Sequence, residues 1–159
     1  MVKNMDETQS RSLLQSATVG RLGCIVNNAP YVVPINFVFD KNRVYSHSLP
    51  GTKIAALREN PRSCLQVDVI HSPLHWSSVI AFGAFKEVTD ADERHQVIKR
   101  ILGRFPMLTP VESTIAMDGS GPSEIVVFQI EIEKISGVTE GEDSDFEMLE
   151  QLGSRTDDF

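Results

Sequence analysis

The sequence predicts a mainly β protein, an antiparallel sheet with two or three short helices at its periphery. Five or six strand-like runs follow one another through short polar turns, without the alternation of strand and helix that builds parallel sheets. Six strands in hairpin order favour a meander or Greek key, closed as a small closed or split barrel. A chain of 159 residues suffices for one such domain with its own core.

Strand-forming runs bounded by turn residues place the strands, and capping residues followed by helix formers place the helices. The predicted strands are residues 19–26, 31–39, 43–46, 63–69, 78–88 and 124–133. The predicted helices begin at Asp6 or Thr8 and end near Gln15, run from Thr52 to Glu59, and run from about Thr89 to Leu102. Residues 1–5 are expected to fray, 71–77 to form an irregular excursion, and 105–122 to form a long loop.

Two features complicate this simple order of elements. Pro34 falls in the middle of the second strand, although proline cannot donate a ladder hydrogen bond. An edge position, a bulge or a position facing a ligand would explain it. From Gly137 onward the chain is acidic and poor in strand formers. We therefore divide it into a barrel domain, residues 1–137, and an acidic C-terminal tail, residues 138–159.

Composition excludes several classes of function. The formal net charge of -7 argues against a nucleic-acid partner. Cys24 and Cys64 both lie in apolar, strand-like runs, so they are read as small buried hydrophobic residues and not as a disulfide framework. No apolar run has the length of a membrane span, and the N-terminus has no signal-peptide core. A cytoplasmic protein with no membrane partner is expected.

The most informative stretch is residues 44–61, which read as a strand end, a polar turn, a short helix and a helix stop. Thr52 is the expected N-cap of this helix. Ser48, Thr52 and Lys53 would place two hydroxyls and an ammonium beside its free N–H groups, and such a helix N-terminus binds phosphate. The alternative is a capped surface helix with a solvated lysine.

The histidines allow weaker inferences. His47 lies between two serines after the third strand, where it could donate a proton or only shape a turn. His71 and His75 have a helical spacing that suits a metal, but Pro73 interrupts any helix there, so no metal site is predicted. Trp76 is read as a core or interface anchor, and His95 as a solvated residue.

Three segments in this order resemble one family. YVVPINFVFD, VYSHSLPGTKIAALRENPRSCLQVD and WSSVIAFGAF resemble the flavin-binding split barrels of the pyridoxamine 5′-phosphate oxidase superfamily, over about residues 10–137. Within it they look most like the group of Nim-type nitroimidazole-resistance proteins. The resemblance implies a six-stranded Greek-key split barrel and a homodimer with FMN at the subunit interface.

The resemblance also implies the residues of the site. Lys53 would contact the FMN phosphate, residues 33–36 would lie along the flavin ring, and His47 would be a proton donor beside it. The implied cofactor-binding residues are Val33, Pro34, Ile35, Asn36, Ser46, His47, Ser48, Thr52, Lys53, Ser77 and Ser78.

Thr52 stands where the family commonly has an arginine, so one charge partner of the phosphate is missing. The chain also departs from true pyridoxamine 5′-phosphate oxidases at two places. Tyr31 stands where those enzymes have an arginine, and EIVVFQIEIE replaces an arginine-rich substrate-binding strand. These two departures argue against vitamin B6 oxidation.

An FMN-dependent oxidoreductase, similar to a flavin reductase or nitroreductase and acting on a small-molecule acceptor, is the leading functional hypothesis. The alternatives are a non-catalytic module that binds flavin or haem, and a deazaflavin-dependent reductase.

Overall fold

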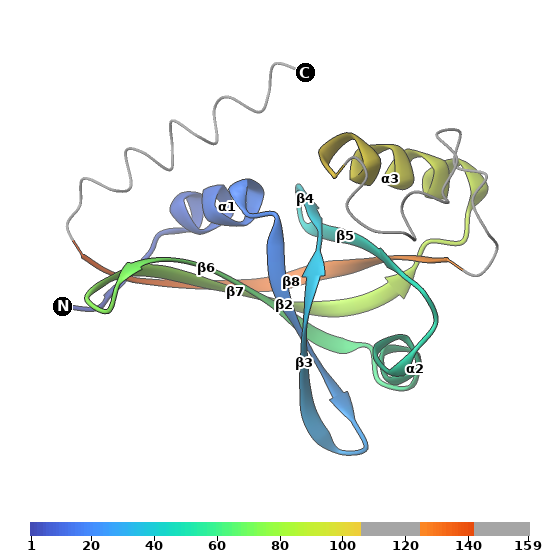
Figure 1. Ribbon diagram of the computed structural model, residues 1–159, viewed down its shortest axis with the longest axis horizontal. Helices are drawn as coiled ribbons and strands as arrows, with labels where there is room; N and C mark the ends of the chain where they lie inside the picture. The colour runs from blue at the N-terminus through green and yellow to red at the C-terminus, as the bar shows by residue number, and fades with distance from the viewer. Residues whose placement is uncertain (106–124, 142–159) are drawn as a thin grey trace.

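The computed structural model describes residues 1–105 and 125–141. Its described part is an eight-stranded antiparallel sheet with three helices (Figure 1). The strands are β1 (Lys3–Asn4), β2 (Val19–Val26), β3 (Ala29–Asn36), β4 (Val38–Asp40), β5 (Arg43–Ser48), β6 (Arg62–Ser72), β7 (His75–Glu87) and β8 (Val126–Glu140). The helices are α1 (Glu7–Ser16), α2 (Thr52–Glu59) and α3 (Ala91–Arg104).

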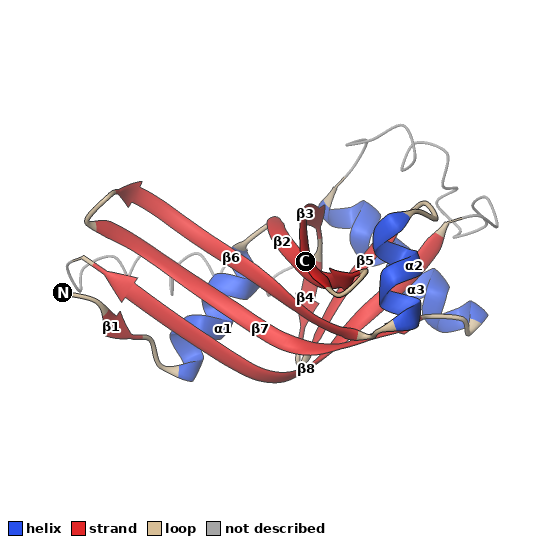
Figure 2. Cartoon of the chain, turned by 90° about the horizontal axis from the view of Figure 1, so that it is seen from below, coloured by secondary structure: helices blue, strands red, loops and turns tan. Residues whose placement is uncertain are grey.

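The sheet connects strands that are distant in the chain. Its order is β3-β2-β6-β7-β8-β5-β4, and β1 pairs with the far end of β8. The pairings of β2 with β6 and of β5 with β8 are the crossovers that a Greek key requires. Figure 2 shows β6, β7 and β8 running side by side as the long strands of the molecule. The predicted mainly β, antiparallel class is confirmed, with eight strands instead of six.

The barrel interior is one apolar cluster closed by two helices. Leu13 and Leu14 of α1 and Ile54 and Leu57 of α2 are fully buried in it, against the inward-facing residues of the sheet. The α1 helix begins where predicted, because Asp6 accepts a hydrogen bond from the Gln9 N–H and the Gln9 side chain accepts one from the Asp6 N–H. The burial of Ile54 and Leu57 therefore fixes which face of α2 packs against the interior.

A second apolar cluster lies outside the barrel under α3. Strand residues alternate between the two faces of a sheet. On β5, Val44 belongs to the interior cluster, whereas Tyr45 belongs to the cluster under Val97 and Ile101 of α3. Figure 1 shows α1 and α3 on one side of the long strands and α2 on the other. Alternation along each strand thus decides which environment a side chain enters.

The second predicted strand divides at Phe37, which separates β3 from β4. The Phe37 side chain is fully buried, and its N–H donates to the carbonyl of Thr18 at 3.4 Å. Pro34 lies in β3, and β3 is an edge strand of the sheet. Of the three explanations for Pro34, the edge position is therefore confirmed, because an edge strand has one side without ladder partners.

Three other boundaries differ from prediction. Residues 1–5 include β1, and the Met5 N–H donates to the Gly137 carbonyl at 2.9 Å, so this segment does not fray. The predicted irregular excursion at 71–77 is wrong, because β6 and β7 continue through it as a hairpin. The last strand continues to Glu140, since β7 offers it partners up to Trp76. The rest of the predicted tail, residues 142–159, and residues 106–122 of the predicted loop lie outside the described residues.

Candidate functional site

A cleft of about 500 Å³ opens where β2 and β6 part. The two strands pair only from Arg21 to Gly23, opposite Gln66 to Cys64, and β2 then continues with β3 alone. The volume lies within the range of about 300–1,000 Å³ that is common for small-molecule sites. The cleft is lined by Gly23, Cys24, Ile25, Pro30, Tyr31, Val32, Asn60, Arg62, Ser63, Cys64, Phe82, Gly83, Ala84 and Glu133.

The floor of the cleft is a row of residues that crosses four neighbouring strands. Register places Val32, Gly23, Cys64 and Phe82 side by side on the outer face of the sheet. Gly23 leaves room there, because a Cβ at that position would lie only 2.8 Å from the Cys64 Sγ. Val32 and Phe82 remain 63% and 40% exposed. The floor is therefore apolar and open, a surface suited to a planar aromatic ligand.

The end of α2 lies beside the cleft, because its C-cap Asn60 and the following Arg62 line it. The N-cap is Gly51 and not the predicted Thr52, and no side chain caps the helix. Its first N–H groups thus keep the partial positive charge of a helix N-terminus without a capping acceptor. The C-terminal end of α2 is tied to β7, because Arg58 donates to both carboxylate oxygens of Glu87 at 3.0 and 2.7 Å. The same contact lowers the pKa of Glu87.

Lys53 lies at this helix start and is half-buried. Burial lowers the pKa of the Lys53 ammonium, and the neighbouring Cys24 opposes the shift slightly. Burial, together with the nearby Cys64, raises the pKa of the Cys24 thiol. Within residues 1–105 and 125–141, no carboxylate forms an ion pair with Lys53. Lys53 does not line the cleft itself, but Cys24 does, and the two interact electrostatically.

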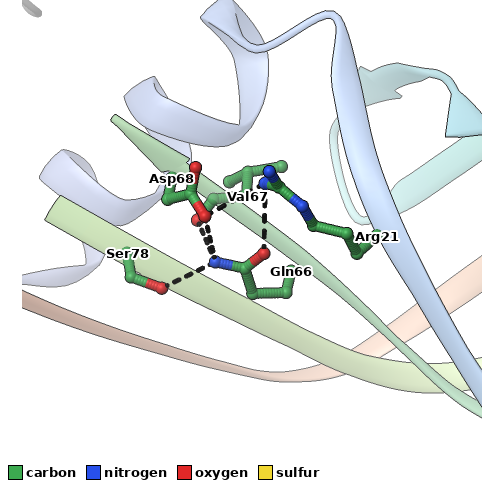
Figure 3. A network of polar contacts seen from close by, with 5 residues as sticks. All are labelled: Arg21, Gln66, Val67, Asp68 and Ser78. Carbon is green, nitrogen blue, oxygen red and sulfur yellow. Dashed lines mark hydrogen bonds and ion pairs between the residues drawn. The ribbon is translucent and has the colours of Figure 1, made fainter. Parts of the chain in front are cut away.

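A polar network lies next to the cleft on the same outer face (Figure 3). The Arg21 guanidinium contacts the Asp68 carboxylate at 3.0 Å, and the Gln66 amide donates to Asp68 at 2.9 Å and to the Ser78 hydroxyl at 3.0 Å. Pro34 pairs with Arg21 across β2 and β3. Of the predicted site residues, Ser78 thus belongs to this network, and Pro34 lies beside it as the register partner of Arg21.

The other predicted site residues do not face one common pocket. Val33 and Ile35 face the barrel interior. The Ser46 hydroxyl donates to the Asn36 carbonyl at 2.7 Å, and the Ser48 hydroxyl donates to the carbonyl of Leu49 at 2.8 Å.

The last three predicted site residues, Ser77, Thr52 and His47, do not line the cleft either. Ser77 is buried, with its Oγ 2.9 Å from the Thr139 Oγ1. Thr52, next to Lys53, is exposed as the first residue of α2. Alternation places His47 on the face of β5 that carries Tyr45, and His47 does not line the cleft.

The cleft brings in residues that the sequence did not single out for a site. Cys24, Cys64 and Phe82 were read only as parts of apolar strands. The local signal that marks them is the absence of a side chain at Gly23 and Gly83, since glycine in a strand indicates a close approach or a bulge. A bulge does occur between Phe82 and Gly83.

Two negative findings concern the described residues alone. No cluster of three or more histidine, cysteine, aspartate or glutamate side chains suited to a metal ion occurs there. None of the helices in these ranges has the length and apolar character needed to cross a membrane.

Comparison with known proteins identifies the family. The family model described as pyridoxamine 5′-phosphate oxidase matches residues 6–139. The chain belongs to this family. A pyridoxamine 5′-phosphate oxidase-like split barrel is thus both the predicted and the observed architecture.

Relatives and solved structures agree with this assignment. An uncharacterised protein of Rhizobium meliloti (strain 1021) is 30% identical over 147 residues, which cover 86% of this chain and 93% of the relative. A crystal structure of a FAD-binding protein from Mesorhizobium loti is similar with a TM-score of 0.68 and 27% identity, over 89% of this chain and 99% of that one. A candidate 5-nitroimidazole antibiotic resistance protein from Bacteroides thetaiotaomicron shares the fold with a TM-score of 0.68, at 20% identity over 87% of this chain and 89% of that one.

Proposed function

We propose that this protein is an FMN-dependent oxidoreductase that passes reducing equivalents to a small-molecule acceptor. The observation that carries the proposal is Lys53, a half-buried cation at an uncapped helix N-terminus, without a carboxylate partner among the described residues. Burying an ammonium costs free energy unless an anion compensates it. A phosphate group of a ligand would supply that anion.

A flavin nucleotide would bridge Lys53 and the cleft, which Cys24 connects. Lys53 and the first N–H groups of α2 would hold the phosphate, and the apolar floor around Val32, Cys64 and Phe82 would hold the ring system. A bound flavin supplies the hydride and electron transfer, and the chain supplies binding, orientation and a site shielded from water. His47 is not needed for this arrangement, so the proposal assigns it no proton transfer.

The family supports a flavin but leaves the nucleotide open. The Mesorhizobium loti structure is of a FAD-binding protein, whereas the resemblance in sequence implies FMN. Lys53 is a single cation, and Thr52 replaces the second basic residue common at this position. One cation beside one helix N-terminus suits the single phosphate of FMN better than the two phosphates of FAD.

The absorption spectrum of the freshly purified protein tests the proposal. We expect a yellow protein that shows flavin bands, releases FMN on denaturation as identified by mass spectrometry, and oxidises a reduced nicotinamide with an added nitroaromatic acceptor. If the denatured protein releases FAD, the proposed nucleotide changes from FMN to FAD, but the flavin site remains. A red protein with haem absorption, or a colourless one that takes up no added flavin, would refute the proposal.

We also propose that the outer face of the sheet pairs with a second copy of the chain. This face carries large apolar side chains that water reaches, among them Val32, Ile70 and Phe82 at 63%, 68% and 40% exposure. Apolar side chains gathered on one face mark an interaction surface. Because the cleft opens on the same face, a partner chain there would cover the flavin.

Charge placed on this face should separate the two copies. We expect the wild type to sediment as a dimer at micromolar concentration and Phe82→Glu to raise the dimer dissociation constant at least tenfold, because a carboxylate would lose its water in the interface. Leu74→Glu is the matched control, since Leu74 is 73% exposed in the turn between β6 and β7. A wild-type protein that sediments as a monomer while holding flavin would contradict this interface.

A further inference from the structure

The hairpin of β6 and β7 brings two histidines together at its tip. The ring centroids of His71 and His75 lie 4.9 Å apart, with an angle of 42° between the ring planes. Pro73 would interrupt a helix here, but the chain forms a hairpin and Pro73 lies in its turn. The proline therefore does not prevent the two histidines from acting together.

A β-bulge produces this approach. Ile70 pairs with Trp76 and Ser72 pairs with His75, so that His71 is the extra residue on β6. A bulge redirects the side chain of the extra residue. The turn that follows is stiff, because proline fixes its own φ and the Leu74 N–H donates to the Ser72 hydroxyl at 3.3 Å. The two rings are thus held close by backbone geometry.

The separation of the rings matches that of two imidazoles on one metal ion. With a metal–nitrogen bond of about 2.0–2.1 Å along the lone pair, the ion lies about 3.2 Å from each ring centroid. When the two nitrogen–metal bonds form an angle of about 90–110°, the centroids of the two rings lie about 4.5–5.2 Å apart. The observed 4.9 Å lies inside this interval. The two rings are therefore already as far apart as two imidazoles that share one ion.

We propose that His71 and His75 form a binding site for a divalent first-row transition-metal ion, with Zn²⁺ as the reference case. Imidazole nitrogen is a preferred ligand of these ions. Each ring would use one nitrogen and keep the other for a further partner, as metal-bound histidines usually do. Since no third protein ligand joins the pair within the described residues, water or an added ligand completes the coordination. The net charge of -7 favours a cation.

This site is separate from the cleft. Cys64 of the cleft and His71 are seven residues apart on the same strand, which corresponds to about 20 Å along β6. Metal binding at the hairpin and flavin binding at the cleft can therefore be measured independently. Failure of one proposal leaves the other intact.

Titration of the metal-free full chain with Zn²⁺, in competition with a chromogenic chelator, tests the site. We expect one equivalent per chain to bind with micromolar affinity. His71→Asn and His75→Asn should each weaken binding at least tenfold. His95→Asn is the matched control, because His95 lies on α3 outside the hairpin and its replacement should leave the affinity unchanged. Melting without metal shows whether each variant folds.

Two results would overturn the proposal. One is wild-type binding only at millimolar Zn²⁺. The other is micromolar binding that survives both histidine substitutions and disappears in Cys64→Ser, since the thiols of the cleft would then be the ligands. Saturating Zn²⁺ should also raise the melting temperature of the wild type and not that of His71→Asn, because a ligand that binds only the folded chain stabilises it.

Discussion

Replacing Leu65 by alanine should lower the free energy of unfolding by about 2–5 kcal/mol, the range measured for leucine truncations in protein cores. Leu65 is fully buried on β6 between Leu22 and Ala81 of the neighbouring strands. Its side chain also fills the space beside Gly20, where a Cβ would come within 2.6 Å of it. Glycine and alanine cannot expand into the vacated volume, so the cavity should persist and the loss should fall in the upper half of this range.

Leu74→Ala provides the matched control for this loss. It removes the same methyl groups from a side chain that is 73% exposed, at the turn that ends β6. A change of less than about 0.5 kcal/mol is expected there. Urea unfolding of the wild type and the two variants, at one protein concentration, compares their midpoints. Equal m-values allow these midpoints to be read as differences in stability. Equal midpoints for the two variants would mean that Leu65 does not pack in the core.

The elements that local chemistry specifies were predictable from the sequence. The start of α1 at Asp6 and the acidic start of α3 each depend on residues within four positions of one another, and the strand 19–26 depends on a contiguous run of strand formers. The elements that depend on distant partners were not. The final residues of β8, Ser136 to Glu140, are polar or glycine except for Val138, yet they form a strand because β7 pairs with them as far as Glu140. Partners in the sheet override weak local propensity there.

The candidate site was harder to predict for a geometric reason. The resemblance marked contiguous residues 33–36 and 46–48, but neighbouring residues of a strand point to opposite faces. Val33 and Ile35 therefore enter the core, while Pro34 stays outside. The cleft floor takes one residue from each of four strands, and only the register of the sheet brings these together. The position of Lys53 at a helix start was predictable, because it is a local feature.

Lys53→Met should weaken FMN binding by about tenfold to a hundredfold. Removing a charge-assisted hydrogen bond costs about 1.5–3 kcal/mol, and each 1.4 kcal/mol is about a tenfold change in the dissociation constant. Methionine keeps the length of the side chain and its apolar contacts. Titration of the flavin-free protein with FMN, followed by flavin fluorescence, measures the loss. Lys99→Met serves as the control, because Lys99 is exposed on α3 and no change in affinity is expected.

The flavin-free Lys53→Met protein should be as stable as the wild type or slightly more stable, which distinguishes a ligand anchor from a structural lysine. Burial lowers the pKa of Lys53, so its charge opposes folding when no phosphate is present. The unfolded chain binds more protons than the folded chain between this lowered pKa and the ordinary lysine value. Wild-type stability should therefore rise as the pH rises through that window, and the variant should lack this rise. The gain is small, because Lys53 is only half-buried and water screens its charge. Reduced stability with unchanged FMN affinity would instead assign Lys53 to the fold and remove it from the site.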